Sequence, residues 1–135
     1  MGRRAIRGLG EIALSVNDLD LMQRFYDSVI GLELMARSET SAFFKIAAGY
    51  GGHTQVLALF VRPLRPERGS PGKTTLDHLA FEIALADFGS EKERLEQLGL
   101  RVETAEHAWV HWRSLYVTDP EGNRVEFVCS DAAVG

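Results

Sequence analysis

The chain has 135 residues, of which 45% are apolar and 25% charged, and this is the composition of a folded globular domain rather than a disordered segment. A net charge of −4 gives no basic footprint for nucleic acid or for an acidic membrane surface. No run of about 18 apolar residues predicts a membrane span, and "MGRRAIRGLG" lacks the apolar core of a secretory signal. A lone cysteine, Cys129, forms no internal disulfide, which favours the cytoplasm.

The first half of the chain predicts a strand, a helix and three more strands. "GEIALSV" at 10–16 has the alternation of a half-buried strand. A helix is expected over 18–29, with Asn17 or Asp18 as its N-cap and Gly31 just beyond its end. Short strands follow at 32–36, 41–46 and 54–61. The segment 62–73 holds three of the four prolines and predicts a linker.

The second half repeats this order. "LDHLAFEI" predicts a strand, a helix follows over 86–98 up to Gly99, and strands are expected at 100–104, 113–118 and 123–129. Three elements align with their counterparts at offsets of 67, 68 and 68 residues: "EIALSV" with "HLAFEI", "GLEL" with "GLRV", and "VLAL" with "RVEF". We therefore predict one α+β domain made of two tandem βαβββ modules, at about 8–61 and 74–130.

One face of these strands gathers candidate metal ligands. Side chains alternate along a strand, so the aliphatic residues of each strand face the helix, and the opposite face carries Glu11, His78 and Glu126. Glu126 follows the turn "TDPEGN" and stands between Val125 and Phe127, where burial is costly unless the carboxylate is paired. Its counterpart in the first half is Ala58.

Two carboxylates and an imidazole suit a divalent cation, and three protein ligands leave positions open for substrate. The alternative reading is structural. A single Glu near a strand end is usually solvated, and a single His in a strand is usually a hydrogen-bonded core residue. The repeat favours the metal site, because it places the candidates at equivalent positions on one face.

The segments "EIALSVNDLDLMQRFYDSVIGLEL", "DHLAFEI" and "RSLYVTDPEGNRVEFV" together resemble the vicinal oxygen chelate superfamily, which includes glyoxalases, fosfomycin- and bleomycin-resistance proteins and extradiol dioxygenases. The resemblance implies paired βαβββ modules whose mixed sheets curl into a cup around a central metal, with helices outside. It also implies that Glu11, His78 and Glu126 occupy ligand positions. One divalent ion per chain is expected, with Fe²⁺ or Mn²⁺ favoured over Ni²⁺, Co²⁺ or Zn²⁺, in a homodimer.

The chain departs from the family pattern at two ligand positions. Glu11 stands where His is common, and Ala58 stands where glyoxalases and epimerases carry Glu or Gln. The alanine resembles the three-ligand set of extradiol dioxygenases. Tyr116 and His107 match the tyrosine and histidine that those enzymes place around a catechol. Their acid–base histidine is replaced by Gln55, with His53 two residues away.

Three functions compete. The first is an extradiol-type dioxygenase acting on a small catechol-like substrate, with His107, Tyr116, His53 and Gln55 as catalytic candidates. The second is a glyoxalase- or epimerase-like lyase or isomerase in which the metal stabilises an enediolate. The third is a metal-free protein that binds aromatic drugs, with which Trp109 and Trp112 are compatible.

Overall fold

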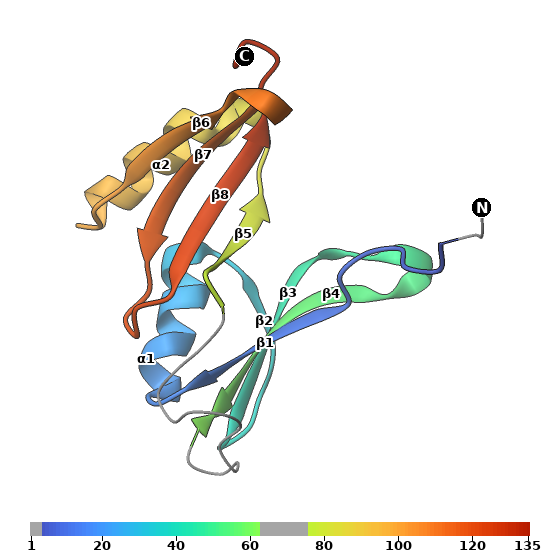
Figure 1. Ribbon diagram of the computed structural model, residues 1–135. Helices are drawn as coiled ribbons and strands as arrows, with labels where there is room; N and C mark the ends of the chain where they lie inside the picture. Colours follow the sequence, from blue (N-terminus) through green and yellow to red (C-terminus); the bar gives the residue numbers. More distant parts are fainter. Residues whose placement is uncertain (1–3, 63–75) are drawn as a thin grey trace. The chain divides into compact units, whose positions relative to one another are not determined.

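The computed structural model describes residues 4–62 and 76–135, and it divides into two compact units, Met1–Pro66 and Glu67–Gly135. Most of the predicted linker, from 63 onward, lies outside the described residues. The chain is α+β, with a strand, a helix and three strands in each unit, as the repeat predicted. The eight strands form two separate four-stranded mixed sheets, one per unit (Figure 1).

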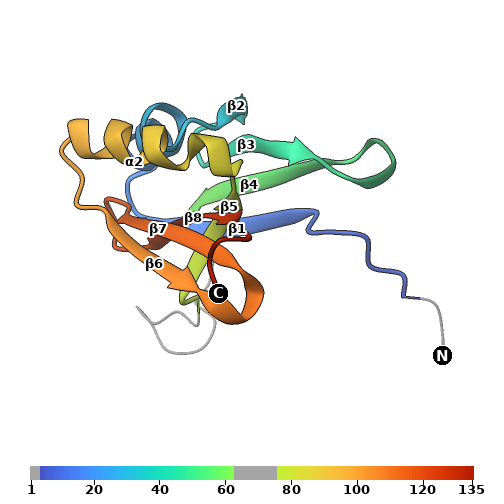
Figure 2. The same cartoon turned by 90° about the horizontal axis from the view of Figure 1, so that it is seen from above.

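In the first unit, strand β1 (Glu11–Val16) pairs in parallel with β4 (Thr54–Val61), and the sheet order is β1-β4-β3-β2. Strands β2 (Glu33–Arg37) and β3 (Ser41–Ala48) complete the sheet with antiparallel pairing. A short 3-10 turn, η2 (Tyr50–Gly52), joins β3 to β4. Figure 2 shows this hairpin and the segment before β1 extending from the same side of the sheet.

Helix α1 (Leu19–Arg24) covers the first sheet. Asp18 caps it by accepting a hydrogen bond from the backbone N–H of Leu21 at 3.0 Å, as the sequence predicted. The expected single α-helix continues instead as a π-helical turn, η1 (Phe25–Ile30), because Tyr26 O accepts hydrogen bonds from both Gly31 N and Leu32 N. Gly31 ends the turn with a φ of 93°, a value that only glycine adopts easily.

The second unit repeats this plan, with β5 (His78–Glu82) parallel to β8 (Arg124–Ser130) and sheet order β5-β8-β7-β6. A 3-10 turn, η4 (Leu85–Asp87), leads into α2 (Phe88–Gln97), which lies along one face of the sheet (Figures 1 and 2). Strand β6 (Glu103–His107), the turn η5 (Ala108–Val110) and β7 (Trp112–Thr118) precede β8.

The strand predicted at 100–104 was placed too early, since β6 begins at Glu103. Leu100 donates its backbone N–H to Leu95 O at 3.2 Å, so the residues just after α2 close the helix instead of pairing with β7. The shift matters for function because it brings His107 into the strand, opposite Trp112.

The strand faces are divided as the alternation predicted. Leu14 and Val16 of β1 and Leu79 and Phe81 of β5 are buried toward the helices. The pairing registers also agree between halves, because Ala13 lies opposite Ala58 in the first sheet and Ala80 lies opposite Glu126 in the second. The internal repeat is therefore visible in the hydrogen-bonded ladder as well as in the sequence. Within residues 4–62 and 76–135, no helix is both long and apolar enough to cross a membrane.

Candidate metal centre

His78 and Glu126 meet on the face of the second sheet that α2 does not cover. His78 opens β5, and Glu126 lies on the neighbouring parallel strand β8, opposite Ala80. His78 Nε2 and Glu126 Oε1 lie 3.0 Å apart. Because Ala80 presents only a methyl group, the imidazole two residues away reaches the carboxylate without obstruction. Two of the three predicted ligands therefore come together within one unit.

Glu126 is almost fully buried, with 5% of its surface exposed. A buried carboxylate requires partners, and each oxygen of Glu126 has one. Oε1 faces His78, and Oε2 accepts a hydrogen bond from Ser114 Oγ at 2.5 Å. Ser114 lies on β7, where it pairs with Val128, and it is completely buried.

The other nitrogen of His78 is held by a second carboxylate. Nδ1 lies 2.7 Å from Asp77 Oδ2, at the residue immediately before β5. Metal-binding histidines usually donate their second ring N–H to a carboxylate or carbonyl, which fixes the tautomer and presents the free nitrogen to the ion. An Nδ1–H group donating to Asp77 presents Nε2 toward Glu126, and this donor set fits a divalent cation.

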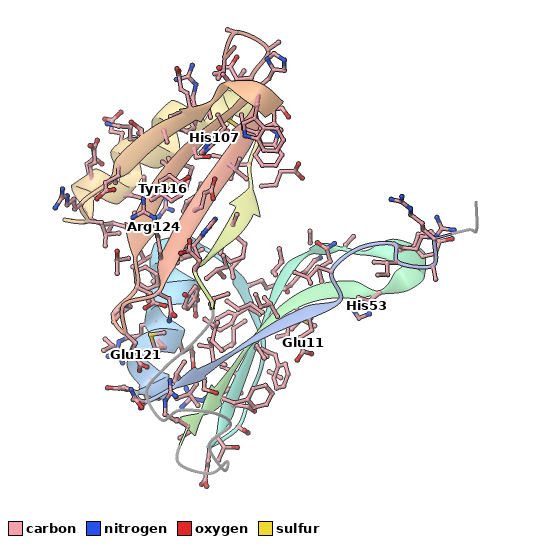
Figure 3. All side chains as sticks on the ribbon, in the orientation of Figure 1. Glu11, His53, His107, Tyr116, Glu121 and Arg124 are labelled. Carbon is pink, nitrogen blue, oxygen red and sulfur yellow. The ribbon has the colours of Figure 1, made fainter. Side chains whose placement is uncertain are left out.

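A second polar group lies beside this pair. The imidazole Nε2 of His107 is 3.2 Å from the Tyr116 hydroxyl, and the Arg124 guanidinium stacks 4.1 Å from the centre of the Tyr116 ring. Arg124 also reaches Glu103 at 3.3 Å. Figure 3 shows His107, Tyr116 and Arg124 following one another across the second sheet. Tyr116 and Glu126 are direct cross-strand partners, so the row adjoins the carboxylate.

Burial raises the pKa of the Tyr116 hydroxyl, and the negative charge of Glu126 raises it further, whereas Ser114 and the positive charge of Arg124 act in the opposite direction. The net rise keeps Tyr116 protonated at neutral pH. Tyr116 therefore acts as a hydrogen-bond donor on this face. His107, predicted as a catalytic candidate, lies within hydrogen-bonding distance of this hydroxyl.

The first unit carries Glu11 at the start of β1, paired with Val56 of β4. By strand alternation Glu11 shares a face with Ala13 and, across the ladder, with Ala58. Among residues 4–62 and 76–135, no three His, Cys, Asp or Glu side chains form a cluster that would hold an ion. Glu11 belongs to the first unit and His78 and Glu126 to the second, so its membership of the ligand set stays a prediction.

Ala58 lies beside apolar residues, between Ala13 of β1 and Phe43 of β3. It pairs with Phe43, and the rings of Phe43 and Phe60 meet edge to face at 5.7 Å. In the pairing ladder Phe43 corresponds to Tyr116, since each lies opposite the fourth-strand position of its module. Ser41 likewise corresponds to Ser114. The first unit thus has the same strand arrangement, but it lacks counterparts of the Glu126 carboxylate and the Tyr116 phenol at these positions.

His53 and Gln55 line a different feature, a pocket of about 230 Å³ between the segment 5–10 and the β3–β4 hairpin. His53 Nε2 lies 3.0 Å from Gly10 O, and the Gly10 backbone is close enough that a Cβ there would meet the imidazole at 3.3 Å. Gln55 shares the strand face of Leu57 and not that of Ala58. In Figure 3, His53 lies beyond Glu11 along the first unit.

Sequence reasoning missed three contributors, namely Asp77, Ser114 and Arg124. Asp77 had a usable signal, because a carboxylate next to a candidate ligand histidine is a common orienting partner. The residue type of Ser114 gave no such signal, since serine occurs at every kind of position. Its role became visible only through the β7–β8 register, which sets it diagonally from Glu126.

At the far end of the sheet, Trp109 is 84% exposed, and Trp112 is partly exposed. Arg113 is held between Asp131 at 3.0 Å and Glu106 at 2.9 Å, so it anchors the C-terminal segment. Asp131 also accepts the backbone N–H of Ala133. That backbone hydrogen bond, followed by the one from Arg113, lowers the pKa of the Asp131 carboxyl below its usual range.

The lowered pKa of Asp131 predicts an acid-sensitive contribution to stability. The folded state favours the carboxylate, so the contribution is complete above the unfolded-state pKa and disappears as the pH falls through the folded-state value. Urea unfolding at several pH values should show that Asp131→Asn is less stable than the parent by a constant margin above about pH 5, and that this margin shrinks below about pH 4. Asp27→Asn, at an exposed position, is the control. An equal margin at all pH values would contradict the assignment.

The chain is similar to a known protein family and to several known proteins. The model of the Glyoxalase/Bleomycin resistance protein/Dioxygenase superfamily matches residues 8–127, which include the first module, all but the last residues of the second and all three candidate ligands. The chain belongs to this superfamily. The resemblance read from the sequence is therefore confirmed at the level of the family and of the fold.

Two curated relatives are thiol or glutathione transferases by their names. A metallothiol transferase FosB from Lysinibacillus sphaericus is 27% identical over 90% of this chain and 82% of its own length. A glutathione transferase FosA from Serratia marcescens is 26% identical over 90% of this chain and 79% of its own. Among solved structures, a lactoylglutathione lyase from Agrobacterium tumefaciens is 30% identical, covers 93% of this chain and 96% of its own, and has a TM-score of 0.74.

Proposed function

We propose that this protein is a divalent-metal-dependent enzyme that acts on a small molecule. The observation that carries the proposal is the Asp77–His78–Glu126 arrangement, in which His78 Nδ1 is tied to one carboxylate and Nε2 faces another, buried one. Such an imidazole is oriented to bind a cation, and the Glu126 carboxylate beside it supplies negative charge that a cation would neutralise. The proposed protein ligands are Glu11, His78 and Glu126.

Two carboxylates and one imidazole suit Mn²⁺, Fe²⁺, Co²⁺, Ni²⁺ or Zn²⁺. When bound, such an ion polarises an oxygen of the substrate as a Lewis acid. Tyr116 stays protonated and donates a hydrogen bond on the same face, which positions an acceptor oxygen of the substrate. His107 lies 3.2 Å from the Tyr116 hydroxyl and helps to hold it in place.

The reaction class we favour is Lewis-acid chemistry, either group transfer to an electrophilic substrate or a lyase or isomerase reaction. Transferases and a lyase stand among the relatives. The ligand set supports the same choice, because a second carboxylate in place of a histidine adds negative charge and weakens the binding of a dianionic catecholate. On this proposal the substrate binds at the face that carries Tyr116 and His107.

An extradiol-type dioxygenase is the second candidate. The observation that favours it is the hydrogen-bonded His107–Tyr116 pair, which is the pair of residue types that the family resemblance implies around a catechol. His53 and Gln55 give it no further support, because they line the pocket at the β3–β4 hairpin.

The deciding experiment measures the metal content of the full-length protein purified without a tag or chelator, and then assays three reactions. We expect close to one divalent ion per chain. The metal-loaded protein should transfer a thiol to an electrophilic small molecule or exchange solvent deuterium into an α-hydroxycarbonyl compound, without consuming oxygen with catechols. Oxygen consumption with a catechol would instead select the dioxygenase. Failure to bind any added divalent ion would defeat both readings and leave aromatic-ligand binding.

The expected homodimer is a separate prediction, which light scattering tests.

A further inference from the structure

Ser114 is a neutral side chain that contacts the candidate ligand Glu126 by donating its hydroxyl to Glu126 Oε2. It lies on β7, two residues from Tyr116, and therefore on the same sheet face. It is fully buried, so its hydroxyl has no competing water. A hydroxyl in this position has one proton to donate, and it donates that proton to Glu126 Oε2.

The two oxygens of Glu126 are thereby made unequal. Oε2 is occupied by Ser114, and Oε1 is directed toward His78 Nε2 at 3.0 Å. A cation held beside His78 would meet Oε1, while Oε2 already accepts the Ser114 proton. Without the hydroxyl, the carboxylate is free to rotate about its terminal torsion, which is broad for glutamate.

We propose that Ser114 is a positioning residue for the metal centre: it holds Glu126 so that Oε1 alone is presented beside His78, and thereby sets the affinity for the cation. The inference rests on the proposed function, because it requires a metal at His78 and Glu126. It goes further in assigning a role to a neutral residue on a third strand, which neither the ligand pattern nor the repeat identified.

The first unit supplies an internal comparison. Ser41 occupies the position in the β3–β4 ladder that Ser114 occupies in the β7–β8 ladder. The fourth-strand residue there is Ala58, which has no carboxylate to orient, and the Ser41 hydroxyl instead lies 2.8 Å from Ser38 Oγ. Serine at this ladder position therefore contacts a carboxylate in the second unit, where the fourth strand carries Glu126, and another serine in the first unit, where the fourth strand carries Ala58.

The test measures the affinity of the full-length chain for Mn²⁺ by competition with a chelating dye, and in parallel the melting temperature of the metal-free protein. Ser114→Ala should bind Mn²⁺ about 10- to 100-fold more weakly than the parent, the range for losing an orienting hydrogen bond to a ligand. Ser114→Thr, which keeps the hydroxyl, should recover most of the affinity.

Two controls separate positioning from loss of packing. Val117→Ala removes buried methyl groups from the helix-facing side of the same strand, so it should lower the melting temperature without changing Mn²⁺ affinity. Ser41→Ala should leave the affinity unchanged. Parent-like affinity in Ser114→Ala, or an equal loss in Val117→Ala, would overturn the inference while leaving the metal site intact. If the parent itself binds no Mn²⁺, the proposed function fails and the role of Ser114 fails with it.

Discussion

Glu126→Gln should lower the affinity for a divalent cation by about 100-fold or more, which is larger than the loss from removing an orienting partner. Glutamine keeps the length and shape of glutamate, and its carbonyl oxygen still accepts the hydrogen bond from Ser114. The substitution thus removes the negative charge beside His78 with little change in packing. It isolates the electrostatic contribution of one ligand.

The measurement is metal stoichiometry and affinity by competition titration with Mn²⁺ and Zn²⁺, together with turnover of whichever substrate the parent accepts. Glu82→Gln is the matched control, because Glu82 is an exposed carboxylate on the same face of β5. We expect the control to match the parent. Undiminished binding in Glu126→Gln would remove the carboxylate from the ligand set and return Glu126 to a structural role as a partner of Ser114 and His78.

Glu11→Ala should also weaken cation binding, by about 10-fold or more, because a three-ligand site that loses one anionic ligand retains only His78 and Glu126. This variant tests the one predicted ligand that the first unit supplies. Glu11 is exposed in β1, so its removal should leave the melting temperature of the metal-free protein unchanged.

Glu11→His makes the test two-sided, since the family resemblance implies that histidine is the more common residue at this position. It should retain tight binding and shift preference toward Zn²⁺, Co²⁺ or Ni²⁺, which imidazole ligands suit better than a carboxylate does. Glu33→Ala, at an exposed carboxylate that opens β2, is the control for general loss of charge. Equal affinity in the parent, Glu11→Ala and Glu11→His would show that Glu11 does not bind the ion.

Much of the fold followed from local patterns. Strand β4 was predicted with its observed bounds, and Asp18 and Gly31 were identified as helix boundaries, because these features depend on neighbouring residues only. The start of β6 depends on where the chain leaves α2 and meets β7, which is a long-range choice. The π-helical turn at Phe25–Ile30 likewise depends on backbone hydrogen bonding that helical periodicity does not distinguish.

The residues of the candidate site were likewise predictable only in part from the sequence. His78 and Glu126 were found because the repeat and the strand alternation together place them on one face. Tyr116 and His107 were named from family resemblance, and their 3.2 Å contact joins two neighbouring strands at positions that do not pair in the β6–β7 register. Ser114 was missed because serine carries no period or charge by which a sequence pattern would mark it.

The alanine opposite Phe43 in the first sheet has a consequence for how the chain tolerates change. Ala58 is fully buried beside Phe43, so Phe43 and Ala58 contribute packing and no charge, and the Ser41 hydroxyl pairs with Ser38. Their counterparts in the second sheet, Ser114, Tyr116 and Glu126, form one hydrogen-bonded group. Substitution is therefore limited mainly by side-chain volume in the first sheet and by hydrogen bonding and charge in the second. The two repeats of one gene should accordingly accept substitutions at different rates at these equivalent positions.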